Sequence, residues 1–240
     1  MRILITNDDS ISAPVLPHLA RWAMKLGEVT IVVPKFEQSG KSHAIELHKP
    51  FEVNKVDFME GVECYTVDSS PADCVRYAVH GMNRTFDLVL SGINKGFNVG
   101  LDIMYSGTVG AIFEAAALDI PAVALSTDPK TFEPALEQLD IALDYFVKHD
   151  LMGKWSLYNV NFPLEYKGIH ITRQGGPLYS DDFPFVSENM VMPSGKYVYQ
   201  FSNDFELDTD AALHGYISIT PMTIARSSET LFHQLRTLNN

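Results

Sequence analysis

Two adjacent carboxylates follow the first apolar run of the chain. Asp8 and Asp9 come directly after residues 3–6, a run rich in β-branched side chains that predicts a buried strand. Ligands of open α/β sheets bind outside the carboxyl ends of the strands, and two neighbouring carboxylates are costly to bury unless a cation compensates them. Mg²⁺ and Mn²⁺ prefer such oxygen ligands. The pair therefore predicts a divalent-metal site, with a solvated helix-capping turn as the alternative for this motif alone.

Small polar residues follow two further expected strands. Ser39, Gly40 and Ser42 come after the second strand, and Asn94 and Asn98 come after a later one. Small residues let backbone N–H groups approach a phosphate closely, and asparagines offer both neutral oxygens and amide donors. A plain surface loop is the alternative for the serine segment when it is considered alone.

The start of an expected helix supplies the third group of candidate binding residues. Ser106, Gly107 and Thr108 lie at the beginning of a helix expected over residues 108–118. Helix N-termini bind anions through free N–H groups and the helix dipole. Ser106 can also be an ordinary N-cap, a role that is compatible with phosphate binding. With Asn7 beside the aspartates, these groups predict a site for one metal ion and one phosphate group.

Such a site predicts metal-assisted hydrolysis of a phosphate ester. The cation would neutralise phosphate oxygens and lower the pKa of a bound water. Backbone amides near Gly40 and at residues 106–108, together with Asn98, would hold the charge that develops during transfer. Asp8 or Asp9 is expected to orient or deprotonate the water, and the residues do not say which. A covalent aspartyl-phosphate is the less favoured route.

Strands and helices alternate over the first 150 residues. This alternation predicts a parallel sheet covered by helices on both faces, that is, a three-layer Rossmann-like α/β core over residues 1–150. The expected strands are residues 3–6, 29–33, 62–67, 88–90 and 122–125, and the expected helices run from Ser12 to a C-cap at Gly27, onward from Ser70, and over residues 108–118 and 134–147.

Residues 151–240 break the alternation and are expected to continue the core with an extended arm and a C-terminal helix. Strands are predicted at 158–162, 169–172, 197–201 and 216–220, a helix at 227–238, and an irregular segment at 175–195. That irregular segment is rich in aromatic residues, and exposed apolar patches mark interaction sites. We expect a homodimer or tetramer built through this segment and the C-terminal helix, with a lid over the site as the alternative.

Composition and net charge limit the classes of partner that the chain can have. It has 240 residues, a formal net charge of -12 and 46% hydrophobic residues, which is ordinary for a folded domain. Its acidity speaks against binding to nucleic-acid duplexes. No apolar run approaches the ~20 residues of a membrane span, and the start of the chain lacks the apolar core of a signal peptide. With only Cys64 and Cys74, these features predict a cytoplasmic protein without a membrane contact.

The chain resembles the SurE family, the survival-protein nucleotidases. The resemblance rests on motifs in order along most of the chain: residues 3–9 (ILITNDD), 38–40 (QSG), 70–75 (SPADCV), 91–94 (SGIN), 105–111 (YSGTVGA), 159–163 (NVNFP) and 215–221 (GYISITP). It implies a Rossmann-like domain, one divalent cation per subunit (Mg²⁺ or Mn²⁺), hydrolysis of nucleoside 5′- and 3′-monophosphates, and dimers or tetramers with C-terminal arms. It also implies the metal ligands Asp8, Asp9, Ser39 and Asn94.

The chain departs from the family pattern at three places. Ser10 stands where the family has glycine, and a serine is strained there if the backbone has φ > 0. Ser69 and Ser70 stand where Gly-Thr is usual, and Glu46 stands where threonine is usual. None of these is a metal ligand, so the expected reaction class is unchanged, while substrate preference and rate stay open.

Other assignments remain open at this point. His43 could reach a phosphate or a leaving group, although a structural or solvated role is favoured. Asp181 and Asp182 repeat the acidic pair in the irregular segment, where a solvated turn is the simpler interpretation. A phosphoacceptor receiver module would use Asp68 as its phosphorylated residue but is about half this length. A non-catalytic nucleotide-binding protein is the third option.

Overall fold

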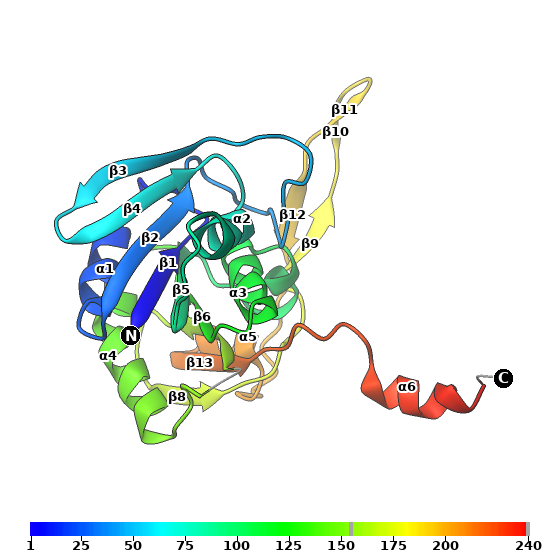
Figure 1. The fold of residues 1–240 in the computed structure, drawn as a ribbon. Helices are drawn as coiled ribbons and strands as arrows, with labels where there is room; N and C mark the ends of the chain where they lie inside the picture. Colours follow the sequence, from blue (N-terminus) through cyan, green and yellow to red (C-terminus); the bar gives the residue numbers. More distant parts are fainter. Residues whose placement is uncertain (154–155, 239–240) are drawn as a thin grey trace.

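A nine-stranded mixed sheet forms the centre of the molecule in the computed structural model, which describes residues 1–153 and 156–238 (Figure 1). Six neighbouring strands in its middle are parallel, and the two antiparallel pairs are β3 with β4 and β13 with β7. The prediction of an α/β sheet is confirmed, with antiparallel additions toward both edges. The strand order is β3 (Val53–Met59), β4 (Val62–Val67), β2 (Glu28–Pro34), β1 (Arg2–Thr6), β5 (Leu88–Lys95), β6 (Ala122–Thr127), β7 (Leu157–Phe162), β13 (Tyr216–Pro221) and β8 (Gly168–Ile171).

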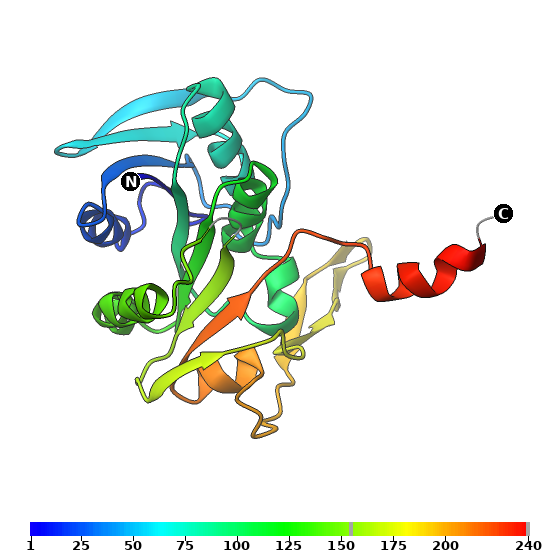
Figure 2. The same ribbon diagram turned by 60° about the horizontal axis from the view of Figure 1, so that its bottom comes forward.

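Helices cover both faces of the sheet (Figures 1 and 2). The period-2 alternation of β1 sends Ile3 and Ile5 to one face and Leu4 to the other. The first face packs against α1 (Leu16–Ala23) and α4 (Glu133–Lys148), and the second packs against α2 (Pro71–Arg76), the π-helical turn η1 (Tyr77–Gly81) and α3 (Gly107–Ala117). The predicted three layers are therefore present.

Two helix starts follow their predicted caps. Ser70 accepts a hydrogen bond from the N–H of Asp73, and Ser106 accepts one from the N–H of Val109. The predicted start of the first helix at Ser12 is wrong, because the Ser12 hydroxyl and N–H are engaged with the Ser10 hydroxyl. That helix begins at Leu16 instead.

The predicted C-cap at Gly27 is also wrong. The first helix ends at Ala23, four residues earlier. A Cβ at Gly27 would lie 2.0 Å from the carbonyl oxygen of Met1, so glycine is needed there for the close approach of two backbone segments.

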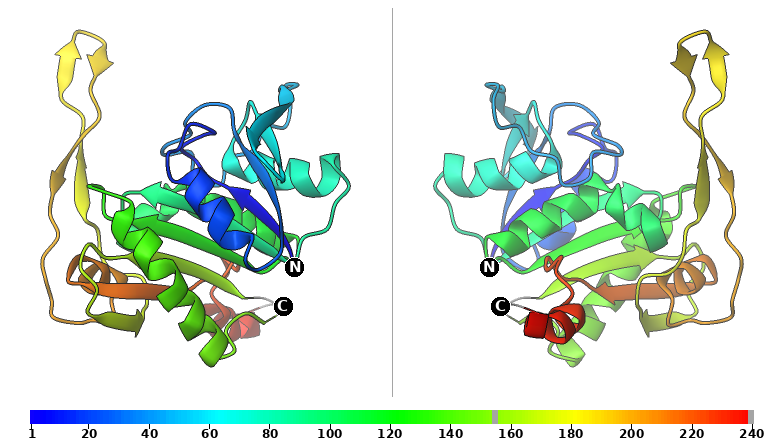
Figure 3. Two further views of the ribbon diagram at one scale, coloured as in Figure 1. Left: turned by 90° about the vertical axis from the view of Figure 1, so that its left-hand side faces the viewer. Right: turned by 90° about the vertical axis from the view of Figure 1, so that its right-hand side faces the viewer.

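The segment expected to be irregular, residues 175–195, forms an antiparallel arm that projects from the body (Figure 3). The strands of the arm are only two to four residues long. This is too short for an alternation of apolar and polar residues to be recognised among glycines and prolines. The arm consists of β9 (Tyr179–Asp182), β10 (Phe185–Ser187), β11 (Met190–Val191) and β12 (Ser194–Tyr197).

The predicted strand at 197–201 is wrong beyond Tyr197, where β12 ends. Residues 198–202 form no strand, and two of them are engaged with a helix instead, because the hydroxyls of Tyr199 and Ser202 both donate to the carboxylate of Asp210. Asp210 belongs to α5 (Asp208–Leu213), a helix that the sequence interpretation missed, as it missed β3.

The chain ends in a helix that leaves the body of the molecule (Figures 1 and 2). This is α6 (Glu229–Leu235), capped by Ser228 and followed by the 3₁₀ turn η3 (Arg236–Leu238), which confirms the predicted helix with a later start. None of its described residues is buried. Over residues 1–153 and 156–238, no helix has the length and apolar character that would let it cross a membrane.

Candidate metal and phosphate site

Asp8 and Asp9 lie just beyond the carboxyl end of β1, in the middle of the sheet. Asp8 is 5% exposed, and its Oδ1 accepts a hydrogen bond of 2.8 Å from the hydroxyl of Thr108. Its backbone carbonyl accepts a second bond, of 2.8 Å, from the N–H of Gln38 in the loop after β2. Asp8 thus connects the end of β1 with the start of α3 and with this loop after β2, which carries Ser39 and Ser42 and is called the serine loop below.

Ser10 completes the turn that presents the two aspartates. Its φ is +74°, in the left-handed region that favours glycine. Asn7 steadies the turn, because its Nδ2 donates to the Ser10 carbonyl over 2.9 Å. The backbone at this departure from the family pattern thus has the positive φ under which a serine is strained, and Ser10 holds a conformation that costs roughly 1 kcal/mol or more.

Burial raises the pKa of both carboxyl groups. For Asp8 desolvation dominates and the Thr108 hydrogen bond opposes it. For Asp9 desolvation, then repulsion from Asp8 and Glu37, raises the pKa to about 6. Glu37 was not among the predicted residues, although it lies only two positions before Ser39. A cation placed among these groups would relieve the repulsion.

The oxygens at this turn suit a small divalent cation. Within the described residues, Asp9 Oδ2 and Asn7 Oδ1 are buried without a hydrogen-bond partner, and buried acceptors in folded proteins normally have one. In the part of the chain described, no three or more His, Cys, Asp or Glu side chains are arranged so that they alone could hold a metal ion. A metal at Asp8 and Asp9 would therefore complete its shell with neutral oxygens and water, as Mg²⁺ commonly does.

Ser39 and Asn94, the other expected ligands, come from the strands that flank β1. Ser39 lies in the loop after β2, is exposed, and donates to Glu37 Oε1 over 2.7 Å. Asn94 lies near the end of β5, and its Nδ2 donates to the Gly96 carbonyl over 2.8 Å, which leaves Oδ1 for another partner. The structure therefore places both residues at the same edge of the sheet as the aspartates.

The N-terminus of α3 abuts Asp8. A Cβ on Gly107 would lie 3.2 Å from Asp8 Cβ and 3.3 Å from Pro71 Cγ, so only glycine fits without displacement. Ser106 caps the helix, which leaves other N–H groups of the first turn for an anion. The Thr108 hydroxyl, expected to contact phosphate, donates to Asp8 here.

The serine loop is fastened to the segment before α3. The N–H of Ser42 donates to the Tyr105 carbonyl over 3.0 Å, and its hydroxyl donates to the Met104 carbonyl over 2.7 Å. Gly110 permits this packing, because a Cβ there would lie 2.2 Å from the Ser42 carbonyl oxygen. Gly40 has φ +69° and open space around it. The loop therefore lies over the start of α3.

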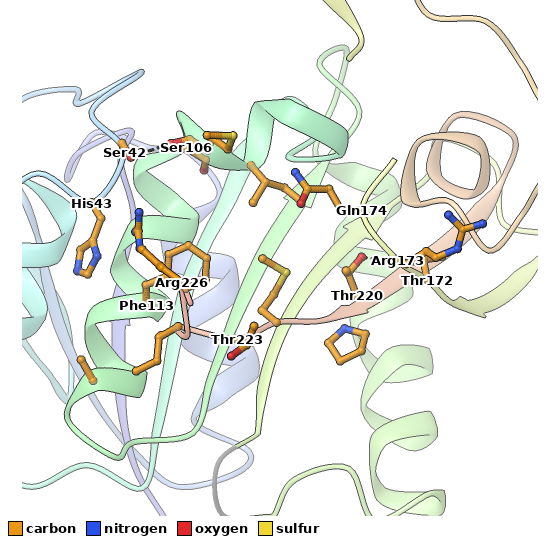
Figure 4. A pocket seen from close by; sticks show the side chains of 17 residues that line it. Ser42, His43, Ser106, Phe113, Thr172, Arg173, Gln174, Thr220, Thr223 and Arg226 are labelled. Carbon is orange, nitrogen blue, oxygen red and sulfur yellow. Dashed lines mark hydrogen bonds between the residues drawn. The ribbon is translucent and has the colours of Figure 1, made fainter. Parts of the chain in front are cut away.

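A cavity of about 620 Å³ opens beside this loop (Figure 4). Ser42 and Ser106 lie at one end of it, Phe113 and Met222 contribute apolar surface, and Arg226 comes from the segment that precedes α6. The lining residues within 172–174 and 222–226 were not recognised in the sequence, because no motif marks them, and Thr220 and Pro221 stood out only as the end of the family motif at 215–221.

His43 also lines this cavity, and its Nε2 lies 2.7 Å from Glu114 Oε2 on α3. That contact is in keeping with the structural role favoured from the sequence. Asp181 and Asp182 lie in β9 of the arm, so they belong to a strand and not to the expected turn. Asn98, expected to contact phosphate, is buried, and its Nδ2 donates to Ser126 Oγ over 2.8 Å.

Comparison with known proteins agrees with this arrangement. A family model described as "Survival protein SurE" matches residues 3–181. The chain belongs to the SurE family. It is 36% identical to the 5′-nucleotidase SurE of Clostridium beijerinckii, with 92% of each chain covered. It is also 36% identical to the 5′-nucleotidase SurE of Thermosipho melanesiensis, with 98% of this chain and 96% of the relative covered.

A solved SurE structure shares the whole fold. The crystal structure of the SurE protein from Aquifex aeolicus superposes with a TM-score of 0.81 at 29% identity, covering 100% of both chains. The family resemblance expected from the sequence motifs is therefore confirmed. The SurE fold brings together the turn at Asp8, the serine loop and the start of α3.

Proposed function

We propose that this SurE-family chain is a phosphatase that hydrolyses nucleoside 5′- and 3′-monophosphates to nucleoside and phosphate, using one divalent cation per subunit, Mg²⁺ or Mn²⁺. The observation that carries the proposal is the contact between Gly107 and Asp8, because it puts an anion-binding helix start beside a carboxylate pair. The curated relatives named 5′-nucleotidase support the substrate class.

Asp8, Asp9, Ser39 and Asn94 would hold the cation. When bound, the cation supplies charge neutralisation at phosphate oxygens and a bound water of lowered pKa. The first-turn N–H groups of α3 would bind the phosphate, with Gly40 as a further backbone donor. The predicted phosphate contact of Ser42 is not part of this proposal, because its N–H and hydroxyl already donate to the carbonyls of Tyr105 and Met104. Asn98 would hold a phosphate oxygen through its carboxamide.

The two aspartates differ in what they can do with a proton. Asp8 is oriented by the hydroxyl of Thr108, which donates to its Oδ1. Asp9 has a pKa of about 6 and a buried Oδ2 without a partner among the described residues. We assign proton acceptance to Asp9, because its Oδ2 is free to accept a proton from a water, whereas Oδ1 of Asp8 already accepts from Thr108.

The receiver-module alternative loses support from the topology. Asp68 follows β4, and β2 separates β4 from β1 in the sheet. A phosphoacceptor should lie near the paired acids at the end of β1, and the neighbouring strand β5 carries Asn94 there instead.

The experiment is a substrate panel. The purified chain is incubated with each nucleoside 5′- and 3′-monophosphate and Mn²⁺ or Mg²⁺, and released phosphate is measured. We expect turnover of the monophosphates and little affinity for duplex DNA. Binding of nucleotides without any phosphate release would favour the non-catalytic alternative and overturn the proposal.

A further inference from the structure

The NVNFP motif of β7 contacts the loop that carries Asn98. Asn161 Oδ1 accepts a hydrogen bond of 2.9 Å from the backbone N–H of Asn98, and Asn161 Nδ2 donates to the Asn98 carbonyl over 3.1 Å. A single carboxamide thus engages both backbone polar groups of one residue. Asn159 adds a third bond, because its Nδ2 donates to the same carbonyl over 2.7 Å.

These asparagines are fully buried on a strand inside the sheet. Asn159 and Asn161 are each 0% exposed, and their spacing of two residues puts both on the same face of β7. β7 lies between β6 and β13, so it is held on both sides. Polar side chains in such a position normally exist for their partners, and the partner here is the loop after β5.

Hydrogen bonds also hold the other end of this loop, at Gly100. The N–H of Gly100 donates to the carboxylate of Asp208 on α5, at 3.1 Å from Oδ1 and 3.0 Å from Oδ2. The Gly100 carbonyl accepts a bond of 2.8 Å from Gln174 Nε2. A loop without regular structure is thereby held at Asn98 and at Gly100 by residues that come from distant parts of the chain.

We propose that Asn161, assisted by Asn159, is a positioning residue for the reaction. It fixes Asn98 against β7, and through that contact it fixes the loop that runs from Asn94 to the helical turn η2 (Gly100–Met104). This inference rests on the proposed function, because it assigns a purpose to the loop that carries Asn94 and Asn98. Transfer of a phosphoryl group to water requires such groups within about 0.5 Å of the productive geometry, and rigid elements supply that better than loops.

The test compares Asn161→Ala with Gln138→Ala. Gln138 is a matched control: it is also a buried carboxamide, 4% exposed, and its Nε2 donates over 3.0 Å to a backbone carbonyl, that of Pro163. It lies on α4, on the opposite face of the sheet from α3. Hydrogen exchange of residues 94–104 is measured in the metal-free variants, and kcat and KM for a nucleoside monophosphate are measured with Mn²⁺.

We expect Asn161→Ala to speed exchange in residues 94–104 and to lower kcat/KM by roughly tenfold to a hundredfold, the range that small misplacements cost. Gln138→Ala should lose stability while leaving the exchange of this loop and kcat/KM close to those of the unsubstituted chain. Asn159→Ala, which leaves both bonds of Asn161 in place, should give a smaller change and serves if Asn161→Ala does not fold.

Two results would overturn the inference. One is a kcat/KM for Asn161→Ala equal to that of the unsubstituted chain. The other is an equal loss in Asn161→Ala and Gln138→Ala that follows the folded fraction alone. If the unsubstituted chain releases no phosphate from any nucleotide, the proposed function fails, and the exchange rates of the metal-free protein still decide whether Asn161 holds the loop.

Discussion

At the scale of single residues, the carboxylate pair opposes folding when no cation is bound. Burial raises the pKa of Asp8, and burial with repulsion raises the pKa of Asp9 to about 6. A raised pKa means that the folded state binds a proton more tightly than the unfolded chain, so stability falls as the pH rises from about 4 to about 6. Residues that reduce stability in this way are normally kept for function.

Replacement of either aspartate tests this directly. Asp8→Asn and Asp9→Asn should each lower phosphatase activity by roughly a hundredfold or more, because each removes a charge that the cation needs. EDTA should abolish the activity of the unsubstituted chain, and Mg²⁺ or Mn²⁺ should restore it. Phosphate release from a nucleoside monophosphate is the measurement.

Thermal unfolding in EDTA at pH 8 provides the control for folding. Both variants should melt at or above the temperature of the unsubstituted chain, since each loses a buried charge whose ionisation opposes folding. Full activity of the unsubstituted chain in chelator would show that the reaction does not need the cation. Melting well below the unsubstituted chain would show that the aspartates stabilise the fold instead.

Residue types revealed only part of the site. Asp8 and Asp9 were recognisable because two adjacent acids at the end of a buried strand add nothing to packing and suit a bound cation. Asn161 stands in a family motif, yet its contact with Asn98 spans 63 positions of sequence. Asp208 lies 108 positions from Gly100, which it holds. No local pattern encodes such pairs, since the fold alone brings them together.

At the scale of elements, α3 depends on a glycine at its first position. A Cβ at Gly107 would come within 3.2 Å of Asp8 Cβ and 3.4 Å of Asp8 Oδ2. Gly107→Ala should therefore lower kcat/KM by roughly tenfold or more, because Asp8 or the helix start must move. Overall stability should change little, since alanine lowers the conformational entropy of the unfolded chain by about 0.4–1 kcal/mol, which offsets the crowding.

Gly153→Ala is the control, because a Cβ there would meet no atom of the described residues within 4 Å. Steady-state kinetics and thermal unfolding of both variants are the measurements. Unchanged kinetics for Gly107→Ala would mean that the contact between α3 and Asp8 does not matter for turnover.

Strong local patterns predicted the elements that hold the site, and weak ones failed. β1, β2, β5 and the cap at Ser106 were predicted from β-branched runs and from capping chemistry. β3 was missed because polar residues interrupt it and it lies at the sheet edge. The arm was missed because antiparallel pairing between β9 and β12 depends on contacts across 12 to 18 positions, not on local preference.

At the scale of the whole molecule, two projecting segments expose apolar side chains. The arm exposes Phe185 at 75% and Met190 at 63%, and the C-terminal segment exposes Leu238 at 72%. Such side chains are costly in water at ~25 cal/mol per Å² of apolar surface, and groups of them mark interaction sites. Both the arm and α6 project from the body of the molecule (Figures 1 and 3).

We therefore expect a homodimer or a tetramer in which the arm and α6 contact neighbouring subunits. Light scattering at micromolar concentration should give a multiple of the 26.8 kDa chain mass. Two variants test the two segments separately: one lacks residues 227–240, and in the other a short turn replaces residues 183–193. Each should lower the molar mass of the oligomer, because each removes apolar surface that the described chain does not cover. Ser228→Ala offers a milder change, since it removes only the cap of α6, worth about 1 kcal/mol. A monomeric unsubstituted chain would contradict the expectation. An unchanged molar mass in one of the two variants would show that its altered segment is not part of the interface, and the other segment would then be the contact.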